Sequence, residues 1–231
     1  MAEPAIAIAD RPAGLLARAS DAARIASEGA PIFVAVLALA AISFLLGFRW
    51  PALLILIFAA AIAAFFRDPQ RYPPRTEGVV LAGADGRVVD VADAEFPGLG
   101  YACSRVSIFM SPLNVHVNRS PVGGEISSIT YSPGKFRAAF GDAASEHNER
   151  NLIEFRARGG ENHAMIQVAG YLARRIVCRV RVRDRVEPGQ RVGVIMFGSR
   201  VDHYVPRGYR VAVATGQNVR AGESVIAELE K

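Results

Sequence analysis

Two apolar runs joined by a short corner constrain the fold of this chain more than any other feature of its sequence. The first run extends from Ala30 to Gly47 and the second from Pro51 to Phe66. A helix needs roughly 20 apolar residues to cross about 30 Å of hydrocarbon, so each run is slightly short. Because Gly47 and Pro51 supply a corner between them, we expect residues 30–66 to form a helical membrane hairpin. A pair of buried core helices is the alternative.

Arginines flank both ends of this hairpin. Residues 1–29 are an alanine-rich leader, expected to be either an amphipathic helix on an anionic membrane or a disordered segment. Residues 67–78 form a linker that contains prolines. The flanking arginines are Arg11, Arg18 and Arg24 before the hairpin, and Arg67, Arg71 and Arg75 after it. The positive-inside tendency therefore predicts a protein of the cell (inner) membrane whose C-terminal domain faces the cytoplasm. The sequence leaves open whether the hairpin spans the bilayer or dips into one leaflet.

The charge balance narrows the class of partner. The 231 residues carry a formal net charge of +5, and arginine supplies nearly all of the positive charge. Arginine binds phosphates and carboxylates through paired hydrogen bonds, which favours an anionic lipid surface or an anionic substrate. The arginines are scattered without an aromatic and basic recognition pattern, so nucleic acid is not expected. Cys103 and Cys178 lack metal-ligand spacing, so we predict neither a metal site nor a disulfide framework.

From residue 79 to 231 the sequence is typical of a β-rich domain. Short β-branched segments are separated by glycine and proline. From Ile176 to Arg183 apolar residues alternate with arginines, which predicts one strand. Gly-Gln turns recur at Gly189 and Gly216, in a repeated sequence pattern typical of biotinyl/lipoyl-like domains. We therefore expect a mainly β fold, a compact barrel or sandwich with pseudo-repeated halves. Chance recurrence of such turns in an ordinary β protein is the alternative.

Three polar positions are candidates for chemistry. Asp85 lies in a turn before an expected strand, His116 lies in an extended segment between prolines, and Ser199 follows Gly198 between two expected strands. The hydroxyl of a serine can attack the preceding glycine carbonyl in a tight turn, because glycine leaves that carbonyl unshielded. An acid and a histidine can activate such a serine. The alternatives are a turn aspartate, a structural histidine and a plain hairpin corner.

Lysine is scarce in this chain. Apart from Lys231, the one lysine is Lys135, so a lysine Schiff base would depend on that residue alone. An enzyme that acts on amines would therefore need another electrophile. The G-x-S-x-G pattern of many hydrolases is absent from the sequence, which disfavours an ordinary hydrolase.

Five short motifs follow one another along the chain. They are Phe-Phe-Arg-Asp-Pro at 65–69, Ala-Asp-Gly at 84–86, Met-Ser-Pro with His116 at 110–116, Asn-Glu-Arg-Asn at 148–151 and Phe-Gly-Ser-Arg-Val-Asp at 197–202. Together they resemble the phosphatidylserine decarboxylase proenzymes of the short, bacterial kind. The resemblance covers roughly residues 60 to 231, and five motifs in order are more specific than any one of them.

The resemblance implies self-cleavage between Gly198 and Ser199. The serine would attack the glycine carbonyl, the resulting ester would eliminate, and the remaining dehydroalanine would hydrolyse to a pyruvoyl group. A large chain of residues 1–198 and a small chain of residues 199–231 would then form a heterodimer, with any higher homo-oligomer left open. The covalent pyruvoyl group, derived from Ser199, would be the cofactor, and no metal would be needed. It would form a Schiff base with the headgroup amine of phosphatidylserine in the membrane and release phosphatidylethanolamine.

The resemblance also implies roles for single residues. Asp85 and His116 would be the orienting acid and the base for Ser199. Arg119 stands where longer members often carry a second histidine, which leaves open whether His116 serves both self-cleavage and decarboxylation; His203 is a less favoured substitute. The candidates for binding the lipid phosphate or carboxylate are Arg119, Arg137 and Arg200.

Two other functions fit parts of the sequence. A pyruvoyl decarboxylase of a soluble amino acid would share the chemistry but have no use for the apolar hairpin. A non-enzymatic, membrane-anchored adaptor with a biotinyl-like domain would keep the bond between Gly198 and Ser199 intact.

Overall fold

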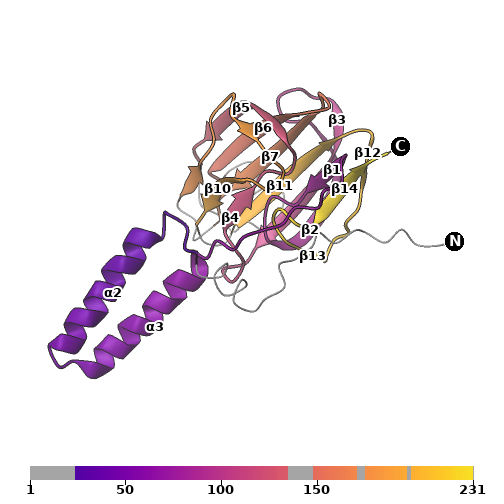
Figure 1. Ribbon diagram of the computed structural model, residues 1–231. Helices are drawn as coiled ribbons and strands as arrows, with labels where there is room; N and C mark the ends of the chain where they lie inside the picture. The colour runs from indigo at the N-terminus through magenta and orange to yellow at the C-terminus, as the bar shows by residue number, and fades with distance from the viewer. Residues whose placement is uncertain (1–23, 135–147, 171–174, 197–198, 231) are drawn as a thin grey trace. The chain divides into compact units, whose positions relative to one another are not determined.

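A computed structural model describes residues 24–134, 148–170, 175–196 and 199–230 of the protein (Figure 1). The chain divides into two compact units, one within Ala13–Gln70 and the other within Arg71–Lys231. Most of the expected leader lies outside the described residues, as do Lys135, Arg137 and Gly198.

Both apolar runs are helical. Helix α2 covers Ala30–Leu45 and helix α3 covers Arg49–Phe65, and the two pack against each other. Pro31 lies in the first turn of α2, where its missing N–H would have no helical partner in any case. Gly47 has a φ of 86° in the corner between the helices, a conformation that suits glycine. Within the described residues, neither helix combines the length and the apolar character required of a membrane span.

The two ends of the helical hairpin are joined at its base. Ile25 and Arg67 form an antiparallel bridge, and the Ala26 N–H donates to the Phe66 carbonyl at 2.7 Å. A side chain at Gly29 would collide with the Phe66 ring, so the backbone and the ring lie in direct contact there. The chain therefore leaves the hairpin beside the point where it entered.

The second unit is built of strands, which confirms the expected mainly β class. The strands form three sheets: an eight-stranded one of order β13-β2-β3-β11-β7-β6-β5-β9, and two of three strands, β1-β14-β12 and β4-β10-β8. Their bounds are β1 Val79–Leu81, β2 Gly86–Glu95, β3 Ala102–Met110, β4 Val117–Arg119, β5 Gly124–Ser132, β6 Arg150–Ala157, β7 Asn162–Val168, β8 Ile176–Cys178, β9 Arg185–Val186, β10 Arg191–Ile195, β11 Ser199–Pro206, β12 Tyr209–Val211, β13 Asn218–Val219 and β14 Val225–Leu229.

The large sheet is curled like half of a barrel (Figure 1). One hydrophobic core takes side chains from all three sheets, for example Ile108 of β3, Ile195 of β10 and Ile226 of β14. A second, smaller cluster around Phe96 and Tyr204 covers part of the other face of the large sheet. Because β11 lies between β3 and β7, its inward side chains point into the main core.

The strand expected from Ile176 to Arg183 is shorter than predicted. Strand β8 ends at Cys178, Val182 is exposed, and Arg183 has a φ of 75°. The carboxylate of Asp184 accepts the Arg181 N–H at 2.7 Å, which stabilises a turn. The alternation that predicted a longer strand therefore continues into a turn. In a turn, alternating residues do not lie on the two faces of a sheet.

The two Gly-Gln turns share one hydrogen-bond pattern. The Gln190 side chain accepts the Glu187 N–H at 3.0 Å, and the Gln217 side chain accepts the Ala214 N–H at 3.3 Å. In each turn the glutamine N–H donates back to the carbonyl of the same partner residue, at 3.0 and 3.1 Å. The sequence echo thus corresponds to equal local geometry.

Candidate active site

Ser199 is the first residue of β11, in the middle of the large sheet. It pairs with Met110 of β3, and its side chain is fully buried. Its hydroxyl donates a hydrogen bond to the Met110 sulfur at 3.3 Å. Val201 and Val205, on the same face of β11 by alternation, belong to the main core. The candidate nucleophile therefore faces an enclosed interior.

A chain of three buried amides leads to this place. The Asn151 amide donates to Gln167 at 2.9 Å, and the Gln167 amide donates to Asn118 at 2.8 Å. The Asn118 amide nitrogen then lies 3.4 Å from the Gly83 carbonyl oxygen and 3.7 Å from the Met110 sulfur. All three amide side chains are buried, and with Gly83 and Met110 they connect five separate segments of the domain.

Sequence reasoning did not single out Asn118 or Gln167. The available signal was a lone amide in an apolar strand: Gln167 lies between Ile166 and Val168, and a buried amide requires hydrogen-bond partners. The identity of its partners depends on strand pairing between distant segments, which no local pattern reveals.

His116 lies immediately before β4 and is buried. Its carbonyl accepts the Ile195 N–H at 3.2 Å, which ties it to β10. It is two residues from Asn118, whose side chain contacts Met110, the hydrogen-bond partner of Ser199. The hydroxyl of Ser199 bonds sulfur and not the imidazole in the described structure, so the role of His116 as base stays a prediction.

The carboxylate of Asp85 is fully engaged. One oxygen accepts from Arg71 at 2.7 Å and the other accepts the Ala221 N–H at 2.7 Å. Burial raises the pKa of Asp85 above its ordinary value, although Arg71 and the Ala221 N–H act in the opposite direction. Arg71 also bonds Glu223 at 3.1 Å. None of these hydrogen bonds joins Asp85 to His116. The role of Asp85 as the orienting acid therefore also stays a prediction.

Two of the three candidate arginines are buried and bound to protein groups. Arg119 donates to the Gly189 carbonyl at 2.9 Å. Arg200 forms a two-pronged ion pair with Asp202, in which both nitrogen-to-oxygen distances are 2.9 Å. Arg137 lies outside the described residues. The assignment of these arginines to substrate binding stays a prediction.

His203 lies away from the serine hydroxyl, against Gly83. Its Nε2 accepts the Gly83 N–H at 3.1 Å, so the neutral ring carries its proton on Nδ1. Burial and the nearby His163 lower the pKa of His203 to about 3, and burial lowers the pKa of His163 to about 4. The His163 ring meets the Tyr209 ring edge-on at 5.1 Å. Both histidines are therefore neutral at pH 7.

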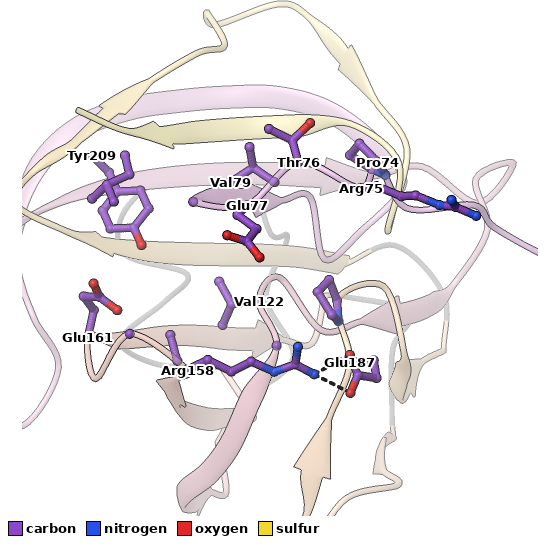
Figure 2. A pocket seen from close by; sticks show the side chains of 16 residues that line it. Pro74, Arg75, Thr76, Glu77, Val79, Val122, Arg158, Glu161, Glu187 and Tyr209 are labelled. Atoms are coloured by element: carbon purple, nitrogen blue, oxygen red, sulfur yellow. Dashed lines mark hydrogen bonds and ion pairs between the residues drawn. The ribbon is translucent and has the colours of Figure 1, made fainter. Parts of the chain in front are cut away.

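The described residues contain no group of three or more His, Cys, Asp or Glu side chains that could hold a metal ion. A cavity of about 570 Å³ opens between the linker and three loops, with Glu77 and Tyr209 on its wall and the Arg158 to Glu187 ion pair at its edge (Figure 2). Ser199 is not part of its lining, so it is distinct from the serine site.

Comparisons with known proteins match nearly the whole chain. The family model described as phosphatidylserine decarboxylase matches residues 58–227. Three similar relatives are each named phosphatidylserine decarboxylase proenzyme. The one from Burkholderia cenocepacia is 44% identical over 211 residues, which is 90% of this chain and 97% of the relative. The one from Syntrophus aciditrophicus is 44% identical over 203 residues, which is 87% of this chain and 95% of the relative. The one from Gluconobacter oxydans is 49% identical over 176 residues, which is 74% of this chain and 78% of the relative.

Proposed function

Because the chain belongs to the phosphatidylserine decarboxylase family, we propose that it releases the serine carboxyl group of phosphatidylserine as carbon dioxide and so forms phosphatidylethanolamine. The observation that carries this proposal is the family match over residues 58–227, which contains every predicted site residue. The relatives also extend over most of this chain and most of their own lengths. The comparisons give no support to a soluble amino acid substrate or to a non-enzymatic adaptor.

Activation of the proenzyme takes place at the bond between Gly198 and Ser199. The Ser199 oxygen bonds to the carbonyl carbon of residue 198, the C–N bond breaks, and the released nitrogen takes a proton. Removal of the Cα proton of residue 199 then breaks the Cβ–O bond and frees residue 198 as a carboxylate. Water replaces the nitrogen, ammonia leaves, and a pyruvoyl group remains on the small chain. The name proenzyme, carried by the relatives, supports this processing.

The fold is compatible with a cut at this place. Ser199 begins β11, so the break falls before the strand and leaves its pairing with β3 and β7 intact. The small chain, 199–231, also contributes β14, the middle strand of a three-stranded sheet. Since the large chain pairs with β11 on both sides through β3 and β7, and with β14 on one side through β1, residues 1–198 and 199–231 stay together as a heterodimer.

The surroundings of Ser199 fit the group formed from it. The side chain is fully buried among core residues, so a ketone at this position is shielded from bulk water. A pyruvoyl group formed from Ser199 would supply an electron-withdrawing carbonyl for the decarboxylation of an amine substrate. The remaining chemistry, which is proton transfer and anion binding, belongs to side chains.

His116 is the proposed base for the Ser199 hydroxyl. Its support is its place two residues before Asn118, whose amide contacts Met110, the hydrogen-bond partner of Ser199. Asp85 is the proposed orienting acid, which requires its carboxylate to exchange a present partner for the histidine ring. The arginines proposed to bind the lipid phosphate or carboxylate are Arg119, Arg137 and Arg200.

The helical hairpin is the proposed membrane attachment. Large apolar side chains on its surface are exposed to an unusual degree, for example Leu45 at 82% and Trp50 at 78%. A contiguous apolar surface of this kind is typical of a membrane contact, and tryptophan favours the interface with water. Together with the arginine flanks, this supports attachment to the cell inner membrane with the β domain in the cytoplasm.

We also propose that the β domain consists of two related halves of the biotinyl/lipoyl kind. The equal hydrogen bonding of the turns at Gln190 and Gln217 supports this. An experimental structure in which the strands flanking both turns superpose would support the proposal, and unrelated strand connections around the turns would remove it.

One experiment tests the activity. Membranes that contain the protein are given vesicles of phosphatidylserine labelled in the serine carboxyl group, and labelled carbon dioxide is collected. Release from the vesicles is expected, and Ser199→Ala should abolish it. Release from free labelled serine alone would point to a soluble substrate instead.

A further inference from the structure

We infer that Gln167 and Asn118 are positioning residues for Ser199. Gln167 fixes the orientation of the Asn118 amide, and Asn118 positions the Met110 sulfur. The Ser199 hydroxyl donates a hydrogen bond to this sulfur before self-cleavage. This inference rests on the proposed self-cleavage at Ser199. It adds residues that the acid, histidine and serine relay does not contain.

The hydrogen-bond directions define each amide. Asn151 donates from its nitrogen to the Gln167 oxygen, so the Gln167 nitrogen is the end that faces Asn118. That nitrogen donates to the Asn118 oxygen, which leaves the Asn118 nitrogen directed at the Gly83 carbonyl and the Met110 sulfur. Because an amide has donors on one side and an acceptor on the other, rotating any one of the three would set like groups against each other.

The backbone leaves space for this arrangement. Gly193 of β10 pairs with Asn118 of β4. A Cβ atom at position 193 would lie 2.9 Å from the Gln167 amide nitrogen and 2.5 Å from the Val177 carbonyl oxygen. Glycine at 193 therefore leaves room for the Gln167 amide beside β10. Apolar side chains could fill this interior without any need for partners, so the buried amides indicate a requirement beyond packing.

The chain of amides ends at a sulfur atom that two donors share. Methionine has a flexible side chain, so contacts decide where its sulfur lies. The Asn118 amide approaches the Met110 sulfur at 3.7 Å and the Ser199 hydroxyl approaches it at 3.3 Å. A thioether is a weak acceptor, so the hydroxyl is held in place without a strong bond that its departure would have to break. This arrangement positions a nucleophile and leaves it available.

The test follows the self-cleavage of freshly synthesised proenzyme over time on denaturing gels. Asn118→Leu and Gln167→Met remove the donors, and we expect each to slow cleavage at least tenfold. Ser120→Ala is the matched control, because its buried hydroxyl donates to the Val122 carbonyl and lies outside the amide chain. It should cleave at the wild-type rate.

Two further readouts separate positioning from loss of structure. Hydroxylamine cleaves an ester, so it should release no additional small chain from Gln167→Met if the serine attack itself is impaired. Extensive hydroxylamine cleavage would place the defect after the attack and overturn the inference.

Gln167→Glu lacks the donor while its carboxyl is ionised and regains it on protonation. Its cleavage rate relative to wild type should therefore rise as the pH is lowered from 8 to 6, in the same folded protein, and a flat ratio would contradict the inference.

The outcomes distinguish this inference from the proposed function. If the wild-type protein and Ser120→Ala never cleave, the proposed self-cleavage fails and the inference fails with it. If both cleave and the Asn118 and Gln167 variants cleave equally fast, the inference alone is overturned.

Discussion

The Ser199 hydroxyl donates its hydrogen bond to the sulfur of Met110, its partner across β3 and β11, at 3.3 Å. A serine proposed to attack its own backbone is thus held by a weak acceptor and not by a base. The next donor to the same sulfur is Asn118, which belongs to the strand that follows His116. The immediate surroundings of the serine therefore position it, and its activation requires a further approach of the base.

Replacing Met110 by leucine should slow self-cleavage several-fold, because the serine hydroxyl loses the acceptor that holds it. Stability should change by less than about 1.5 kcal/mol, since leucine and methionine have similar volumes. Met165→Leu is the control, because Met165 is an equally buried methionine whose sulfur does not bond Ser199. Gel time courses and denaturant titrations measure both quantities. Unchanged cleavage in Met110→Leu would show that the sulfur has no positioning role.

Acid should destabilise the fold through His163 and His203. Their folded pKa values lie at about 4 and about 3, below the ordinary value of about 6.5, so the unfolded chain binds more protons in between. The free energy of unfolding should therefore be insensitive to these groups above pH 6.5 and fall as the pH drops below it. His163→Phe should reduce the slope between pH 6.5 and 4. Equal slopes for wild type and variant in denaturant titrations would contradict this account.

Arg71 should stabilise the β domain by neutralising Asp85. Its partner is nearly buried, so Arg71→Met leaves a charged carboxylate without its main cation and should cost about 3–5 kcal/mol of unfolding free energy. Arg158→Met is the control, because its ion pair with Glu187 is solvent-exposed and should contribute no more than about 1 kcal/mol. Chemical denaturation measures both. Similar small losses in the two variants would indicate that Asp85 does not depend on Arg71.

Charged residues on the helical hairpin should weaken membrane attachment. An aspartate in the hydrocarbon costs about 2.5–3.5 kcal/mol, so Leu54→Asp and Ile57→Asp should each reduce the bound fraction in vesicle flotation. The side chains of Leu54 and Ile57 are both exposed in the structure. Leu113→Asp is the control, because Leu113 is an exposed apolar residue of the β domain, and its binding should not change. Equal flotation of all variants would remove the hairpin as the attachment.

Local patterns were sufficient to predict the mainly β class of the fold and the two helices that precede it. Strand alternation, turn glycines and apolar runs act over a few residues, so the helices and the β domain could be read directly. The same reasoning was wrong beyond Cys178, where alternation continued into a turn stabilised by Asp184. Alternation alone does not distinguish a strand from a turn whose side chains happen to alternate.

The partners of the site residues could not be predicted. Asn118, Gln167 and Met110 meet only because β4, β7 and β3 are brought together by pairings between distant segments. Arg71 was expected as a charge beside the membrane, and in the structure it bonds Asp85. Such contacts depend on the whole topology, which a single sequence does not reveal.

Mass spectrometry of the small chain tests the central claim most directly. The chain that begins at residue 199 is predicted to have the mass of residues 199–231 with a pyruvoyl group in place of the N-terminal serine, and to resist N-terminal sequencing. A single uncut chain with an ordinary serine at position 199, in protein that decarboxylates phosphatidylserine, would contradict the account.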